Sequence, residues 1–182
     1  MEKIGFFGGC FNPPTNIHIE IARNLINEKK VNKVIFVPVN DYYEKNNLEY
    51  SEHRYNMLKL ATDNFENLEV DDIEIKQDKK LYAEDAFELI KKSKFIEKNF
   101  NTDIFLIMGS DNYKKMPKWK NYKEIKDRYK YIVIERNEKT ISSTQIRKMI
   151  EEKNEGVKKF LSEEVYKYII KNNLYSKKCK DW

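Results

Sequence analysis

Short apolar runs alternate with amphipathic stretches along most of this chain, and no other feature of the sequence restricts its fold as strongly. Each run ends at a glycine, a proline or a charged residue, as buried strands often do. The stretches between the runs repeat apolar residues at helical spacing. Strands that alternate with helices predict βαβ units. We therefore expect one α/β domain with a doubly wound parallel sheet and helices on both faces.

The expected elements follow directly from these patterns. The run at 68–75 alternates apolar and acidic residues, which predicts a strand with one solvent-exposed face. The other predicted strands cover 4–7, 34–37, 104–108 and 131–134. The predicted helices cover 16–29, 51–61, 82–90, 142–150 and 161–174.

Composition excludes several other classes of protein. A length of 182 residues suits one domain, which we place at residues 1–175, and we expect the Lys-rich tail at 176–182 to be flexible. No apolar run approaches the roughly 20 residues of a membrane helix. Two cysteines without a CxxC pair make no disulfide framework. The net charge of +5 is spread along the chain rather than clustered. We expect a cytoplasmic protein that binds neither nucleic acid nor membrane.

The loops that follow the strands are the expected ligand sites, because ligands of such sheets bind beyond the carboxyl ends of the strands. In the first of these loops, Gly8 and Gly9 would let the backbone approach a ligand closely. His18 follows in the first turn of the next helix, whose free N–H groups and dipole suit a phosphate. A plain strand–helix turn with His18 on the surface explains the same residues, so this loop alone leaves both interpretations open.

A second candidate phosphate site begins the helix near Ser142. Ser142 and Gln145 have the spacing of a capping box, which explains these two residues structurally. Ser143, Thr144 and Arg147 are not explained by capping, and hydroxyls beside a guanidinium are suited to bind phosphate. A well-capped surface helix is the alternative.

Together the two segments resemble the signature motifs of the nucleotidyltransferase superfamily. The first reads Gly-x-Phe-x-Pro-x-x-x-x-His from Gly9 to His18, with Ile17 where the family usually has a glycine, and the second reads Ile-Ser-Ser-Thr-x-x-Arg from Ile141 to Arg147. Within the superfamily the chain is similar to the nicotinate mononucleotide adenylyltransferases over nearly its whole length. Further matching positions are Phe36-Val37-Pro38 with Lys45, Tyr82 with Asp85, Gly109 and Asp111 with Trp119, and the ending from Val165 to Tyr175.

Two segments depart from that family's pattern. Tyr42, Tyr43 and Glu44 stand where the family usually has Pro-Pro-His. Ala83 replaces a threonine that helps hold the pyridine carboxylate in the family, so one side-chain donor is missing. We expect nicotinate mononucleotide to remain the better acceptor through backbone N–H groups, with weaker discrimination than the family shows.

The resemblance implies a Rossmann-like fold and an adenylyltransferase that joins ATP and nicotinate mononucleotide to give deamido-NAD and pyrophosphate in NAD biosynthesis. His18 and Arg147 would be the catalytic residues, Mg²⁺ would be bound through the ATP phosphates, and no protein-held metal is expected. The resemblance implies that ATP is bound by Gly8, Gly9, Cys10, Phe11, Thr15, His18, Gly109, Asp111, Ile141, Ser142, Ser143, Thr144 and Arg147. The acceptor would be bound by Asn12, Lys45, Tyr82, Ala83 and Trp119.

Several alternatives stay open at this point. A sister nucleotidyltransferase would use CTP, or another acceptor such as nicotinamide mononucleotide or phosphopantetheine, but Lys45 and Trp119 argue against it. A non-catalytic nucleotide-binding module would be expected to lack His18 or Arg147, and both are present. An RNA-binding module related to class I tRNA synthetases lacks support, because no Lys-Met-Ser-Lys-Ser loop occurs. For Trp119, packing of its loop on the sheet is the alternative to stacking on the acceptor ring. The oligomeric state is open, with a homo-oligomer as one option.

Overall fold

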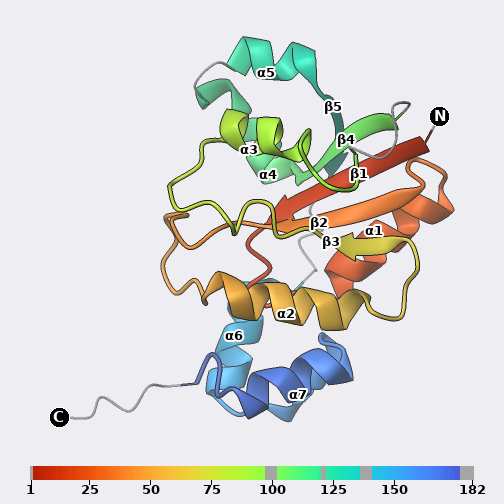
Figure 1. Cartoon of the computed structure of the whole chain (residues 1–182). Coiled ribbons are helices and arrows are strands. Elements are labelled where there is room, and N and C mark those ends of the chain that lie inside the picture. Colours follow the sequence, from red (N-terminus) through yellow and green to blue (C-terminus); the bar gives the residue numbers. More distant parts are fainter. Residues whose placement is uncertain (1, 97–101, 120–121, 136–140, 177–182) are drawn as a thin grey trace.

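The computed structural model describes residues 2–96, 102–119, 122–135 and 141–176. Its centre is a sheet of five parallel strands in the order β3-β2-β1-β4-β5 (Figure 1). The strands are β1 (Glu2–Gly9), β2 (Lys33–Pro38), β3 (Leu68–Val70), β4 (Thr102–Gly109) and β5 (Lys130–Ile134). The chain runs outward from β1 to β3 and returns to β4 on the other side of β1. The predicted doubly wound α/β fold is therefore confirmed.

Helices cover both faces of the sheet, as Figure 1 shows. One face packs against α1 (Asn16–Asn27) and α2 (Ser51–Thr62). The other packs against α3 (Ala83–Ile90), the 3₁₀ turn η1 (Met116–Lys118) and α5 (Tyr122–Arg128), with the short α4 (Ser110–Lys115) directly after β4. A third layer, formed by α6 (Ser143–Glu151), the 3₁₀ turn η2 (Glu155–Lys159) and α7 (Glu163–Lys171), packs on the side of α2 that faces away from the sheet.

Strand β1 is central in the sheet, and its side chains alternate between the apolar clusters on the two faces. Ile4 and Phe6 belong to the apolar cluster on one face of the sheet, whereas Phe7 belongs to the cluster on the other. Gly5 lies between them, and a Cβ at this position would be 2.6 Å from the Ile107 side chain on β4. The strand is thus buried on both faces, as expected for parallel sheets.

The prediction of a half-exposed strand over 68–75 is wrong beyond Val70. Asp71 and Glu74, expected on the solvent face, are only 2% and 9% exposed. The Asp71 carboxylate accepts hydrogen bonds from the Ile73 N–H and the Ser93 hydroxyl. The bond to Ile73 closes a local turn, so the chain leaves the sheet after Val70, and the bond to Ser93 satisfies the buried carboxylate.

Other boundaries differ by a few residues from the predicted ones. Helix α1 ends at Asn27, because Lys29 takes a left-handed backbone conformation with φ of 56°. Helix α7 is shorter than predicted, although Leu161 and Leu174 on either side of it are buried. The predicted tail at 176–182 lies outside the described residues except for Ser176. In the described part of the chain, no helix has the length and apolar character needed to span a membrane.

Candidate active site

A cavity of about 550 Å³, called the first cavity below, lies at the carboxyl ends of β1, β4 and β5. The beginnings of α1, α4 and α6 complete its walls. It therefore occupies the topological switch between β1 and β4, where α/β sheets bind ligands. The residues predicted to bind ATP line it, with the exception of Arg147: Gly8, Gly9, Cys10, Phe11, Thr15, His18, Gly109, Asp111, Ile141, Ser142, Ser143 and Thr144.

Two hydrogen bonds hold the start of α6 against residues 10–15, which we call the nucleotide loop. The Ser143 hydroxyl donates to the carbonyl of Pro13 over 3.2 Å. The Arg147 Nη1 donates to the carbonyl of Asn12 over 2.9 Å. The two motifs, which lie 130 residues apart in the sequence, thus form adjoining walls of one cavity.

The predicted capping box at the start of α6 is present. The Ser142 hydroxyl oxygen accepts from the Gln145 N–H, and the Gln145 Oε1 accepts from the Ser142 N–H over 2.8 Å. Capping therefore accounts for Ser142 and Gln145. The hydroxyls of Ser143 and Thr144 remain beside the N-terminal end of the helix dipole, which favours an anion.

The glycines in the wall of the first cavity are explained in two different ways. A Cβ at Gly9 would lie 3.0 Å from the ring of Phe11, so a side chain at this position would require that ring to shift. A Cβ at Gly8 or Gly109 would meet no protein atom within 4 Å. These two glycines therefore leave open space above the ends of β1 and β4, where a ligand can approach the backbone.

His18 lies in the first turn of α1, and its ring orientation is determined by Thr15. The Thr15 backbone N–H donates to the Nδ1 of His18 over 3.0 Å, and the Thr15 hydroxyl lies 2.8 Å from the same nitrogen. Because a backbone N–H can only donate, Nδ1 is an acceptor and the neutral ring carries its proton on Nε2. The ring packs edge-on against Phe11 at 5.2 Å. Burial lowers the pKa of His18 to about 4, so the ligand-free protein presents a neutral imidazole at neutral pH.

Arg147 stands behind the cavity wall rather than in it. Its Nη1 bonds to Asn12, and its Nη2 donates to the Thr144 hydroxyl oxygen over 3.3 Å. A guanidinium has five N–H donors, so these two bonds leave others for a ligand. Its contact with a phosphate remains a prediction.

A second, smaller cavity of about 120 Å³ adjoins the first and shares Gly8 with it. Ala83 and Trp119, both predicted to bind the acceptor, line this second cavity. The Trp119 ring also packs 6.3 Å from Phe87, so it contributes to the core packing as well. The remaining walls come from Phe6, Val37, Glu74, Ala86, Ile90, Leu106, Ile107, Met108 and Asn112.

Three predicted acceptor residues lie elsewhere. Lys45 lines the first cavity, not the second. The Tyr82 side chain is 62% exposed and lines neither cavity. Asn12 is 1% exposed, and its side chain is hydrogen-bonded to neighbouring loops rather than directed at a cavity.

Glu74 is a candidate site residue that the sequence did not indicate. Glu74 lines the second cavity, and burial raises its pKa to about 7, although the Asn40 N–H and the charge of Arg54 act in the opposite direction. Its place in an alternating apolar–acidic run made it resemble a solvent-facing residue. No local signal in the sequence distinguishes a buried acidic residue from a solvent-facing one in such a run.

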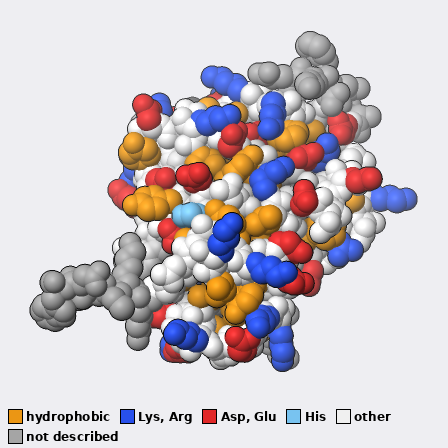
Figure 2. Space-filling model, turned by 60° about the horizontal axis from the view of Figure 1, so that its bottom comes forward, with side chains coloured by type: hydrophobic (Ala, Val, Ile, Leu, Met, Phe, Trp, Pro, Cys, Tyr) orange, Lys and Arg blue, Asp and Glu red, His pale blue; other side chains and the backbone are white. Residues whose placement is uncertain are grey.

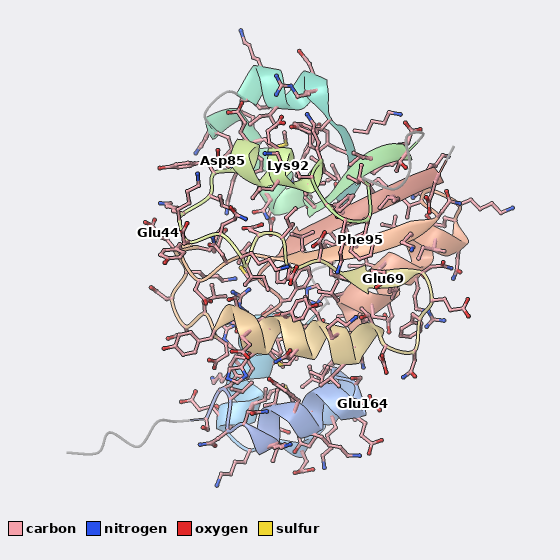
Figure 3. All side chains as sticks on the ribbon, in the orientation of Figure 1. Glu44, Glu69, Asp85, Lys92, Phe95 and Glu164 are labelled. Atoms are coloured by element: carbon pink, nitrogen blue, oxygen red, sulfur yellow. The ribbon has the colours of Figure 1, made fainter. Side chains whose placement is uncertain are left out.

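The loop between β2 and α2 is fastened to the segment that precedes α3. The side-chain amide of Asn40 donates to the carbonyl of Lys79 over 2.8 Å. Glu44, one of the departures from the family pattern, forms an ion pair with Lys80 at 2.9 Å. Figure 3 shows Glu44 on the same side of the molecule as Asp85 at the start of α3. The negative charge of Glu44 is therefore offset by Lys80 rather than by its neighbour Lys45.

Arg54 is a second residue whose role the sequence did not indicate. It is fully buried on α2 and donates to three backbone carbonyls: Glu49 over 2.7 Å, Cys10 over 3.1 Å and Val39 over 2.6 Å. It thus joins the nucleotide loop to both ends of the loop between β2 and α2. A charged residue on an amphipathic helix normally predicts exposure, which is why its role was not evident.

Comparison with known proteins assigns the chain to a family. Residues 6–149 match the family model described as cytidylyltransferase-like, and the chain belongs to this family of nucleotidyltransferases. The probable nicotinate-nucleotide adenylyltransferase of Endomicrobium trichonymphae is 30% identical over 96% of this chain and 100% of that protein. The nicotinate-nucleotide adenylyltransferase of Bacillus subtilis is 28% identical over 96% of this chain and 99% of that protein. Within the larger family, the chain therefore belongs to the nicotinate-nucleotide adenylyltransferases.

Solved structures share the fold. Nicotinic acid mononucleotide adenylyltransferase of Plasmodium falciparum, complexed with NaAD, superposes with a TM-score of 0.75 at 22% identity, over 96% of this chain and 98% of that one. A putative nicotinate-nucleotide adenylyltransferase from Vibrio parahaemolyticus gives a TM-score of 0.73, also at 22% identity, over 98% of each chain. At these identities the likeness establishes the arrangement of strands and helices.

Proposed function

We propose that the protein transfers the adenylyl group of ATP to nicotinate mononucleotide, giving deamido-NAD and pyrophosphate. One observation supports the proposal: the two motifs predicted to bind phosphate meet at the first cavity, and a second cavity with an aromatic wall adjoins it. The first cavity falls within the usual size range of small-molecule sites. Relatives that match nearly the whole chain carry the name of this activity.

The reaction needs no general base. One phosphate oxygen of the mononucleotide attacks the α-phosphorus of ATP, the bond from that phosphorus to the bridging oxygen breaks, and pyrophosphate leaves with the electron pair. A phosphate monoester has a second pKa of about 6, so the attacking group is mostly ionised at neutral pH. Catalysis then depends on alignment of the two phosphates and on stabilisation of the developing charge.

The residues of the first cavity would supply that stabilisation. The Nε2–H of His18 would donate to a phosphate oxygen, because Thr15 already occupies Nδ1. Ser143, Thr144 and the N–H groups at the start of α6 would hold the triphosphate. Arg147 would add charge from behind the nucleotide loop.

Mg²⁺ would enter this site with the nucleotide. Among the described residues, no group of three or more His, Cys, Asp or Glu is arranged to hold a metal ion. Hard oxygen ligands suit Mg²⁺, and ATP phosphates provide them. Asp111 and Glu135 also line the first cavity.

The second cavity would receive the pyridine ring, with Trp119 as its aromatic wall and Lys45 near the phosphates. Nicotinamide mononucleotide is the second candidate acceptor, and Glu74 favours it. A carboxylate in this cavity disfavours an acceptor ring that carries a negative charge, and an amide lacks that charge. Ala83 adds no side-chain donor to counteract this effect.

The test measures pyrophosphate release from ATP with Mg²⁺ against a panel of phosphorylated acceptors, with the dinucleotide product identified by mass spectrometry. Nicotinate mononucleotide is expected to give the highest kcat/KM. Release with phosphopantetheine, or with CTP in place of ATP, would instead assign a sister activity.

The proposal also places the protein in the cytoplasm, where ATP is available. In the view of Figure 2, basic and acidic side chains are interspersed, without a patch of one sign among the described residues of that face.

A further inference from the structure

Asn12 is hydrogen-bonded to several separate segments around the candidate active site. It lies in the nucleotide loop and is 1% exposed. Its Nδ2 donates to the carbonyl of Asn47 over 2.8 Å, and its Oδ1 accepts from the Glu49 N–H over 3.2 Å. Its backbone carbonyl accepts from Arg147. One buried side chain therefore fastens the nucleotide loop to the residues just before α2.

The remaining bond of Asn12 comes from the far end of the chain. The Tyr175 hydroxyl donates to the Asn12 Oδ1 over 2.8 Å, across 163 residues of sequence. Tyr175 follows α7 directly after the buried Leu174, and it takes a left-handed backbone conformation with φ of 59°. Burial raises the pKa of Tyr175, with Glu49, Arg54 and Arg147 as the nearby charged groups. Its hydroxyl therefore stays protonated and remains a donor at neutral pH.

We propose that Tyr175 is a positioning residue for the adenylyl transfer, which holds the nucleotide loop, residues 47–49 and Arg147 in one arrangement through Asn12. This inference rests on the proposed function. Tyr175 does not line either cavity, so it acts through Asn12 rather than on a substrate. Without its hydroxyl, the Asn12 Oδ1 keeps only the longer bond to Glu49. The loop that carries the predicted phosphate ligands then loses its hydrogen bond to the segment after α7, and only the bonds from Ser143 and Arg147 on α6 still join it to the third layer.

Tyr168 provides a matched control on the same helical layer. Its hydroxyl bonds to the His53 Nδ1 at 2.9 Å and to the Asn56 Nδ2 at 3.1 Å, both on α2. Both tyrosines pack against the apolar cluster of α6 and α7. The Tyr168→Phe variant thus removes an equivalent hydroxyl from the same layer without touching the nucleotide loop. Any difference between the two Phe variants reports on the bond to Asn12.

The first measurement is steady-state kinetics with thermal unfolding for both Phe variants. Tyr175→Phe is expected to lower kcat about tenfold or more, because small misplacements of reacting groups are costly, with a smaller change in the KM for ATP. Tyr168→Phe should keep near-normal kcat at a similar Tm. Asn12→Ala should lower kcat in the same way, and adding Tyr175→Phe to it should lower kcat little further. Equal kcat in the two Phe variants at matched Tm would overturn the inference.

A second measurement does not need activity. Hydrogen exchange of the ligand-free protein, followed by mass spectrometry, should show faster exchange at residues 8–15 and 45–50 in Tyr175→Phe than in Tyr168→Phe. Unchanged exchange in both segments would refute the positioning role. If the wild-type protein forms no dinucleotide with any acceptor, the proposed function fails, and the exchange data alone decide whether Tyr175 orders the nucleotide loop.

Discussion

Replacement of His18 by alanine and by glutamine should separate two ways in which this residue can act. His18 is at the third position of α1, where its Nδ1 completes a capping box with Thr15. Glutamine is a usual residue at that position, so its Oε1 can keep the bond to Thr15 while its NH₂ group still donates toward the cavity. Alanine loses both functions.

The expected magnitudes follow from these contacts. Loss of one donor to a developing charge costs about 10²-fold to 10³-fold in kcat, and loss of a cap costs about 1 kcal/mol in stability. His18→Ala should therefore show a kcat at least about 10²-fold lower and a modest decrease in stability. His18→Gln should keep wild-type stability and lose roughly tenfold less activity than the alanine variant.

The pH dependence distinguishes a neutral donor from a cation. Because the pKa of His18 is lowered to about 4, the ring is already neutral across the assay range, and kcat/KM, which reports the free enzyme, should show no decline from His18 above pH 6. The assay is pyrophosphate release between about pH 6 and 8.5, with circular dichroism melts for each variant. Two results would refute the reasoning. One is an equal loss of kcat in His18→Gln and His18→Ala, combined with a decline of kcat/KM near neutral pH that the wild type shows and both variants lack. The other is a near-normal kcat in His18→Ala with only a raised KM for ATP.

Three further predictions follow from the site. Arg147→Lys should lower kcat by at least about tenfold, because lysine cannot reproduce the fork that reaches Asn12 and Thr144, and equal kcat would contradict a role in charge stabilisation. Ala83→Thr should raise the ratio of kcat/KM for nicotinate over nicotinamide mononucleotide about tenfold, by one hydrogen bond to a charged group, and an unchanged ratio would exclude this position from acceptor binding. Glu74→Gln should stabilise the protein at high pH. The folded-state pKa is raised from 4.5 to about 7, so the stability that the protonated carboxyl contributes is fully present below pH 4.5 and is lost as the pH rises through 7. Urea melts at about pH 5 and 9 should show a stability difference between Glu74→Gln and wild type that grows with pH, and a constant difference would contradict burial of the charge.

Much of the fold could be predicted because its signals are local. The apolar runs at 4–7 and 104–108 are bounded by charged residues and glycines, and each became a central strand. The capping box at Ser142 was readable because both partners lie within four residues of each other. The two predicted phosphate motifs were readable because each is a short pattern, and a parallel sheet places the loops after its strands at one edge.

Polar residues in the interior were not predictable in this way. Asp71, Glu74 and Arg54 have the sequence context of surface residues, yet all three are buried. Burial of a polar side chain requires partners that satisfy it, and the partners of Arg54 are backbone carbonyls of loops whose positions depend on the whole sheet.

The sequence by itself determined the order of the strands and of the helices except α4 and α5, which it did not predict. It also determined the location of the ligand-binding edge and the residue types that surround it. The tertiary structure decided which of those residues face a cavity and which hold the loops in place. Asn12, predicted to touch the acceptor, is hydrogen-bonded to Tyr175 from the opposite end of the chain, a contact that the sequence did not indicate. The physical reason is that local patterns record the periodicity of burial, whereas the pairing of a buried polar group depends on contacts between distant segments that form only when the domain is packed.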